Sequence, residues 1–383
     1  MKHLKNNFFK VAIFVATLFS WTSLSAQTYN NWLLSYGYIL NFNTNPPSID
    51  KIDFNCRRIA FALSDENGNI VLYGGDVVDN TDENHVSCTF IIKNAQHQIL
   101  VSLPNVRIIN ITGCKSNNKD GSFYVSVITS FKPHYNIYSL RLYSFDNKGV
   151  LKDSLISNSF NYSSLAFFMP YVNGDVNFFV YVQKNKTIES YKMSENKILR
   201  DKTYEVELPN FYSNALFYTI APFMNGRQMF CSFSEKVFLL DFDNVNNVFS
   251  VKKEYQNLGN IVLSNNEKYI VSLNDGKLFR YELTDNFELK NGKLIYDSDT
   301  ENISRIDDIR LGVDGKIYAI EAVLGNSPNR IIYFDNIESN DITIGVIEGD
   351  LSKSLVFFPN VPHFFYVDNN PCKESKKSVI ICE

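Results

Sequence analysis

The chain has 383 residues, of which 45% are hydrophobic and 14% aromatic, and it carries a formal net charge of −4 with a pI near 5.8. This apolar and aromatic content excludes an intrinsically disordered chain, and the acidic balance argues against a nucleic-acid-binding protein. The length allows one large domain or two ordinary ones.

The first 26 residues have the pattern of a secretory signal peptide. Lys2, Lys5 and Lys10 form a basic stretch, an apolar run follows from Val11 to Phe19, and small residues lead to Ala26. The run is too short to span a bilayer, although an uncleaved anchor is the alternative. We expect cleavage after Ala26, which leaves 34 basic and 41 acidic residues, a net charge of −7. The mature chain has no run of about 18 apolar residues, so we expect no transmembrane segment in it.

All six cysteines lie in the mature part, at positions 56, 88, 114, 231, 372 and 382. In an exported protein disulfides can persist, and six cysteines allow fifteen connectivities. Cys372 and Cys382 flank a short Lys-rich tail and are the most plausible local pair. Cys231 lies in an apolar strand pattern, which predicts a buried thiol without a disulfide.

Helical periodicity is nearly absent, and short apolar or alternating runs end at turns that recur along the chain. The first kind of turn carries Gly before an apolar strand, because a tight hairpin needs positive φ at its centre. Its third residues are Gly68, Gly121, Gly174, Gly226, Glu267 in a degenerate copy, and Gly315. The intervals are 53, 53, 52, 41 and 48 residues, which indicates a repeat.

A second kind of turn, an acidic residue followed by Asn, keeps step with the first. It occurs at Asp146-Asn147, Glu195-Asn196, Asp243-Asn244, Asp285-Asn286 and Asp335-Asn336, with Asp79-Asn80 as the expected first copy. Each copy follows an aromatic-bearing strand. Two kinds of turn in fixed phase indicate one unit of about 40–50 residues, with four short strands and two hairpins.

Such a unit is typical of a β-propeller blade. The sequence therefore predicts an all-β propeller over residues 27–370, with seven four-stranded blades and a short basic, Cys-containing tail at 371–383. Six or eight blades, or two β-sandwich domains, are the alternatives. We expect Trp32–Phe42 and Leu355–Tyr366 to meet and close the ring, and the aromatic residues to stack between neighbouring blades.

Several motifs give the chain a resemblance to secreted β-propeller proteins of gliding Gram-negative bacteria, which are associated with type IX secretion. They are Asn31-Trp32, Leu40–Asn43, Pro46-Pro47, Ser64–Tyr73, Leu240–Asn244, Ile309–Tyr318 and Phe358–Asn360. The resemblance implies export and a propeller fold. Many such proteins continue into further β-domains and a sorting domain, whereas this chain ends at Glu383. We therefore expect a secreted or cell-surface protein, with the periplasm as an alternative.

A search of the sequence for catalytic and ligand motifs finds little. The four histidines of the mature chain show no zinc spacing, and nucleophile elbows, phosphate loops and dinucleotide fingerprints are absent. We therefore predict no metal site, no cofactor and no catalytic residue. Asp307-Asp308 precedes a predicted strand, and adjacent strand residues point to opposite faces, which argues against an acid–base pair.

Both kinds of turn are expected at one rim of the propeller, so the more variable loops lie at the other. Aromatic residues in exposed loops suit contacts with a protein or a glycan, although they can also be packed loop anchors. The candidate ligand-binding residues are Phe131, His134, Tyr135, Phe211 and Tyr212. The sequence thus favours an exported, non-enzymatic binding or scaffold propeller with a protein or glycan partner and no nucleic-acid partner. The alternative is a propeller enzyme acting on glycans with carboxylates at the channel mouth.

Overall fold

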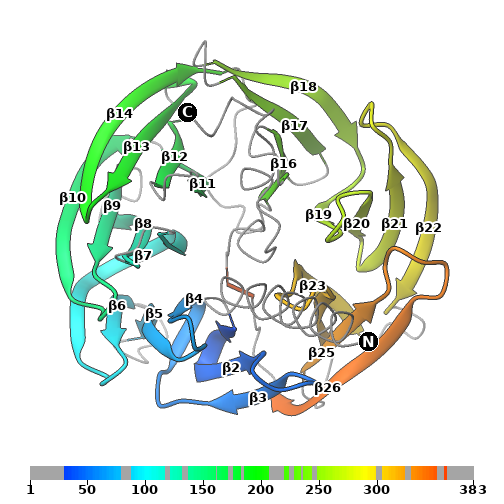
Figure 1. Cartoon of the computed structure of the whole chain (residues 1–383), viewed down its shortest axis with the longest axis horizontal. Helices are drawn as coiled ribbons and strands as arrows, with labels where there is room; N and C mark the ends of the chain where they lie inside the picture. Colours follow the sequence, from blue (N-terminus) through cyan, green and yellow to red (C-terminus); the bar gives the residue numbers. More distant parts are fainter. Residues whose placement is uncertain are drawn as a thin grey trace, which may run out of the picture.

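The computed structural model describes residues 30–78, 88–116, 121–131, 137–160, 162–170, 176–182, 185–206, 220–223, 228–233, 236–243, 248–298, 304–323, 329–351 and 358–359. Antiparallel sheets stand radially around a common centre (Figure 1). The protein is a β-propeller, and the predicted fold class is confirmed. Within these ranges no helix has the length and apolar character needed to cross a membrane. The predicted signal segment 1–26 and the tail 371–383 lie outside the described residues.

Within the described ranges, hydrogen bonds join the strands into six sheets. The first sheet has three strands and a 3-10 turn, η2 (Ser35–Gly37): β1 (Asn31–Leu33), β2 (Tyr38–Asn41) and β3 (Ser48–Lys51). The second has seven strands: β4 (Cys56–Ser64), β5 (Ile70–Val78), β6 (Cys88–Asn94), β7 (Ile99–Lys115), β8 (Phe123–Phe131), β9 (Ile137–Phe145) and β10 (Leu151–Phe160).

The other four sheets have four strands each and follow one another along the chain. The third and fourth sheets comprise β11 (Tyr162–Pro170), β12 (Val176–Val182), β13 (Thr187–Ser194), β14 (Lys197–Glu205), β15 (Ile220–Pro222), β16 (Gln228–Phe233), β17 (Lys236–Asp243) and β18 (Val248–Gln256). The fifth and sixth comprise β19 (Asn260–Leu263), β20 (Tyr269–Asn274), β21 (Lys277–Leu283), β22 (Leu289–Asp297), β23 (Ser304–Leu311), β24 (Ile317–Val323), β25 (Asn329–Asp335) and β26 (Thr343–Leu351).

The predicted count of seven separate four-stranded blades is wrong for the described residues, where five sheets have four or more strands. The main reason is β7, a strand of 17 residues. Its first part, to Val106, pairs with β6, and its part from Val106 onward pairs with β8. Two copies of the repeat are therefore fused in one seven-stranded sheet. The first sheet contributes only three strands within the described ranges.

The predicted Gly turns are hairpins between the first and second strands of a repeat. Gly68, Gly121 and Gly315 have φ of 80°, 61° and 80°, while Gly174 and Gly226 lie outside the described residues. Glu267, in the degenerate copy, has φ of 58°. The same backbone geometry is thus kept where the glycine has been lost.

The acidic-Asn turns lie at the same end of the sheets, between third and fourth strands, but the first copy was wrongly assigned. Asp79-Asn80 lies outside the described residues, and in the sequence it follows β5, the second strand of its repeat, rather than the third. The matching hairpin is Asn94–Gln98, between β6 and β7, where His97 has φ of 62°. The prediction failed because this turn contains no acidic-Asn step.

Aromatic side chains fill the space between neighbouring sheets, as predicted. The ring of Phe179 on β12 packs against Phe242 on β17 and Phe249 on β18, with centroids 5.5 and 5.4 Å apart. Other buried residues of these two sheets, among them Met229 and Cys231, complete the cluster. Each sheet is therefore stabilised by burying its faces against its neighbours, because apolar burial is the main favourable contribution to folding.

The two ends of the described chain are in contact. The ring of Phe358 lies 5.2 Å from that of Trp32, and Trp32 also contacts Tyr318 on β24. Most of Leu355–Tyr366 lies outside the described residues, so its pairing with Trp32–Phe42 stays a prediction.

Cys231 is fully buried and has no disulfide, as predicted, and Cys56 and Cys114 are also buried thiols. Burial raises the pKa of the Cys56 thiol to about 12. These three cysteines are therefore packing residues. Cys372 and Cys382 lie outside the described residues.

Candidate functional site

The end of the ring opposite the repeat turns, which we call the loop end, carries the connections in which the candidate binding residues lie. Phe131 is the last residue of β8, and its backbone pairs with Val106. His134, Tyr135, Phe211 and Tyr212 lie outside the described residues. Apart from the backbone of Phe131, the predicted binding site therefore stays a prediction.

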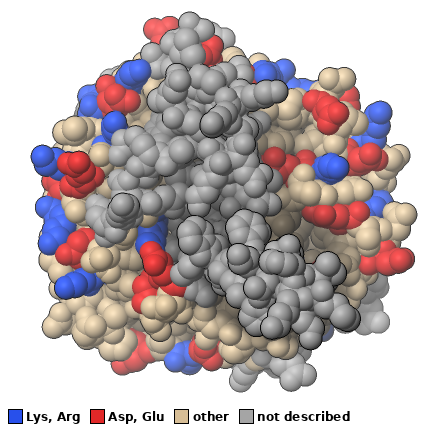
Figure 2. Space-filling view, viewed as in Figure 1, with Lys and Arg blue, Asp and Glu red and all other residues tan. Residues whose placement is uncertain are grey.

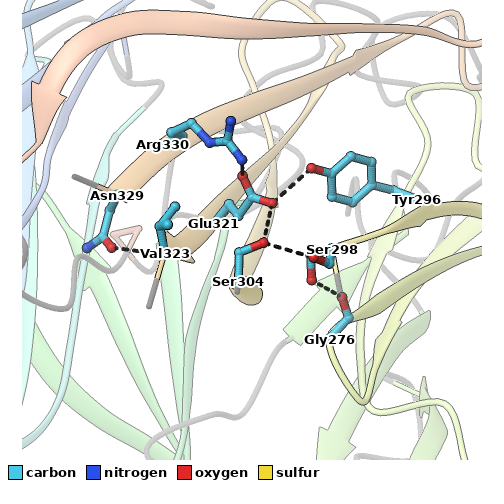
Figure 3. A network of polar contacts seen from close by, with 8 residues as sticks. All are labelled: Gly276, Tyr296, Ser298, Ser304, Glu321, Val323, Asn329 and Arg330. Carbon is cyan, nitrogen blue, oxygen red and sulfur yellow. Dashed lines mark hydrogen bonds and ion pairs between the residues drawn. The ribbon is translucent and has the colours of Figure 1, made fainter. Parts of the chain in front are cut away.

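The loop end between the fifth and sixth sheets contains a polar network centred on Glu321 (Figure 3). Glu321, near the end of β24, is 1% exposed. Its Oε1 atom accepts hydrogen bonds from the Tyr296 hydroxyl on β22 and the Ser304 hydroxyl on β23, both at 2.9 Å. Its Oε2 atom forms an ion pair with Nη2 of Arg330 on β25. A buried carboxylate is thus bound by side chains of three strands, which offsets its desolvation.

This network makes Arg330 a fixed cation at the surface. The Arg330 side chain is 50% exposed, although its guanidinium is held by a carboxylate that solvent scarcely reaches. Burial and the adjacent Glu321 carboxylate raise the pKa of Tyr296 to about 12, so this phenol stays protonated and donates. An arginine held in one orientation loses little side-chain entropy when it binds a ligand.

The same network fixes the ends of the strands that lead into three connections. Ser304 Oγ lies 2.9 Å from the Ser298 carbonyl, and the Ser298 hydroxyl donates to the Gly276 carbonyl at 3.1 Å. Val323 N donates to the Asn329 side chain at 3.3 Å, across the base of the connection between β24 and β25. At the fifth and sixth sheets the strand ends that lead into the loops are therefore held by hydrogen bonds. Loops on a rigid scaffold are a common arrangement for binding surfaces.

The sequence interpretation missed Glu321 and Arg330. One signal was present, because Glu321 is the only charged residue in the apolar stretch of β24. A lone acidic residue in a buried strand requires a partner. Which partner it has depends on strand register, since Arg330 is directly opposite Glu321 across the β24–β25 pair.

Asp307 and Asp308 lie inside β23, which corrects the prediction that they precede a strand. The pairing register shifts between Ile306 and Asp308, so Asp307 is the extra residue of a β-bulge, and the strict alternation of faces is interrupted there. Burial raises the pKa of both carboxyls, and the adjacent guanidinium groups of Arg305 and Arg310 offset this only in part.

The Asp308 carboxylate is bound by other groups of the protein. Its oxygens accept hydrogen bonds from Ile309 N at 2.9 Å and Phe358 N at 3.2 Å, and Arg310 Nη1 lies 3.0 Å away. A carboxylate with these partners holds the chain end and the bulge in place. This arrangement suits a structural role better than proton transfer to a substrate.

Other candidate chemistry in the described part of the chain is sparse. His97 is hydrogen-bonded to Tyr73, with 2.6 Å between the hydroxyl and Nδ1. No group of three or more His, Cys, Asp or Glu residues among those described is arranged to hold a metal ion. The other mature histidines, His85, His134 and His363, lie outside the described ranges.

Comparisons with known proteins give a fold without an activity. No protein-family model matches the chain, and no curated protein matches its sequence. A functionally unknown protein from Desulfotomaculum acetoxidans is similar in structure, with a TM-score of 0.50, 10% identity, and coverage of 86% of this chain and 99% of that one. The β-propeller domain of the Trilobed protease from Pyrococcus furiosus has a TM-score of 0.42 and 11% identity, with 82% and 86% covered. At such identities the likeness to the Desulfotomaculum protein concerns the fold alone.

Proposed function

We propose that this protein is an exported, non-enzymatic binding or scaffold propeller that contacts a protein or a glycan through its loop end. The observation that carries the proposal is the Glu321 network, which fixes the half-exposed Arg330 beside the bases of several connections. The repeat turns occupy the other end, where short hairpins leave little variable surface. The signal-like pattern of residues 1–26 supports export to the periplasm, the cell surface or the medium.

The enzyme alternative requires carboxylates that converge on a substrate at the channel mouth. The acidic pair that the sequence offered, Asp307 and Asp308, is bound largely by the protein itself. This observation favours a binding role over hydrolysis or lysis of glycans.

The proposal is tested by glycan-array binding and by pull-down with the purified protein. We expect a ligand whose binding is lost when His134, Tyr135, Phe211 and Tyr212 are replaced together by Ala. The matched control replaces Lys148, in a repeat turn at the opposite end, and binding should then be unchanged. The absence of any ligand in both assays would overturn the binding function.

A further inference from the structure

Three cations lie at the loop end of the fifth and sixth sheets. Arg305 is the second residue of β23, Arg330 is the second residue of β25, and Lys277 is the first residue of β21. These three strands all begin at the loop end. The strands that come between them in the chain, β22 and β24, run in the opposite direction and end there. Residues far apart in sequence are thus brought to one edge of the ring.

Each cation is paired with a carboxylate that is more buried than itself. Arg305 Nε lies 2.7 Å from Asp307 Oδ1, with side-chain exposures of 62% and 10%. Arg330 pairs with Glu321, at 50% and 1%. Lys277 Nζ lies 2.7 Å from Asp297, at 39% and 26%. Each pair has no net charge, but its cation is the more exposed group and its carboxylate is the more buried one.

Exposed cations paired with more buried carboxylates also occur elsewhere, as in the Arg200–Glu189 pair, but here three of them lie at one end of two adjacent sheets. Acidic and basic side chains are interspersed around the ring on the face shown in Figure 2, and the chain as a whole is acidic. An anionic ligand would therefore be attracted by fixed local dipoles and hydrogen bonds rather than by net charge. Guanidinium groups suit this role, because their remaining N–H donors match the two oxygens of a carboxylate.

The spacing of the two arginines favours a stiff ligand. Arg305 and Arg330 lie on strands separated by one strand, so their Cα atoms are about 10 Å apart, two strand spacings. Both guanidinium groups are oriented by buried carboxylates, so the site is largely fixed before binding. A polymer with carboxylates at regular positions on a stiff backbone loses less conformational entropy on such a site than a flexible acidic peptide does.

We propose that the edge formed by Arg305, Arg330 and Lys277 binds a carboxylate-bearing glycan. This inference rests on the proposed binding function and names the ligand class that its loop end recognises.

The test measures binding of the purified protein to three polymers by calorimetry: polygalacturonate, the same polymer with its carboxylates methyl-esterified, and poly-glutamate. We expect polygalacturonate to bind most tightly, the ester to bind at least about tenfold more weakly, and added salt to weaken binding. Arg305→Gln and Arg330→Gln should each weaken binding by about tenfold, and together by more.

The matched control is Arg200→Gln, because Arg200 pairs with the buried Glu189 at 2.7 Å and is 57% exposed, but lies on the outer strand β14. It should leave binding unchanged, and circular dichroism should show all variants folded. Equal binding of the ester, unchanged binding by the double variant, or preference for poly-glutamate would overturn the glycan assignment. If none of the three polymers binds while another ligand is found on the array or by pull-down, this inference fails and the binding function stands.

Discussion

The ring of Phe358 packs edge-on against the indole of Trp32, with the two ring centroids 5.2 Å apart and the ring planes at 69°. This contact joins the first strand of the propeller to the last described residues of the chain. Both side chains are at most 5% exposed. A ring of sheets is stable only if its first and last members are held together, so this contact should support the whole structure.

We predict that Phe358→Ala lowers the free energy of unfolding by about 3–5 kcal/mol, because it leaves a cavity beside Trp32. It should also shift the fluorescence of folded Trp32 to longer wavelength, since water reaches the indole. The chain has two tryptophans, Trp21 and Trp32. The emission is therefore recorded on protein without residues 1–26, during urea unfolding.

The control for this experiment is Phe249→Ala. Phe249 is as buried as Phe358, at 3%, but packs between the third and fourth sheets. It should destabilise the protein by a similar amount and leave the emission of folded Trp32 unchanged. An unshifted emission in Phe358→Ala would contradict the proposed closure of the ring.

Asp308 should give the stability a distinct pH dependence. Burial raises the pKa of its carboxyl in the folded protein, despite the nearby Arg310. Between the unfolded and folded pKa values the folded state binds the extra proton, so this group's contribution to stability falls as pH rises through the folded pKa. Asp308→Asn removes the ionisation, but its one amide oxygen can replace only one of the two oxygens that accept from Ile309 N and Phe358 N.

We therefore expect Asp308→Asn to lose less stability than the wild type between about pH 4 and about pH 7. At about pH 4 the variant should have the lower urea midpoint, because it lacks one acceptor, and the gap between the two proteins should narrow toward about pH 7. A large loss of stability confined to neutral pH would instead mean that the ion pair with Arg310 outweighs the cost of burial.

Glu267 occupies the position of the repeat glycine and has φ of 58°. An L-residue in this left-handed conformation costs about 1–2 kcal/mol relative to one in an allowed region. We predict that Glu267→Gly raises the urea midpoint, by up to about 1 kcal/mol in stability, because glycine adopts this φ without strain. Glu282→Gly, within β21, is the control and should lower the midpoint. If both variants are destabilised, the contacts of Glu267 outweigh its backbone strain.

The success and the failure of the sequence interpretation have separate physical reasons. The turns at Gly68 and Gly315 were predictable, because the steric need for positive φ is local and leaves a mark in two or three residues. The continuity of β7 was not predictable. Nothing in the segment around Pro104 and Asn105 says whether a strand leaving one repeat also begins the next, since that depends on which strands flank it.

The Glu321 network was hidden for a related reason. Tyr296, Ser304 and Arg330 lie on three different strands, and they meet Glu321 only once the register and the packing of two sheets are known. The sequence marked Glu321 as an unusual residue in β24, but it could not identify its partners. The candidate residues in the loops, from Phe131 to Tyr212, remain a prediction.

The ion pair between Glu321 and Arg330 allows a quantitative test of the framework at the loop end. Glu321→Gln should lower the stability by about 1–3 kcal/mol, because it weakens the buried bonds from Tyr296 and Ser304, while the half-exposed Arg330 that loses its counter-charge stays solvated. Arg330→Gln should also destabilise, since the buried carboxylate then lacks a cation. The double variant should lose less than the sum of the two losses, because the groups act on each other.

The same cycle on Glu189 and Arg200 supplies the comparison. Glu189 also accepts a tyrosine hydroxyl, from Tyr191 at 2.7 Å, but it is more exposed than Glu321 and both partners belong to its own sheet. Its coupling energy, measured by urea unfolding of the four proteins, should be smaller than that of Glu321 with Arg330 because solvent screens it more. Equal coupling energies in the two cycles would mean that burial between sheets adds nothing to the Glu321–Arg330 pair. The loop end would then be held no more firmly at Glu321 than the outer strands β13 and β14 are at Glu189.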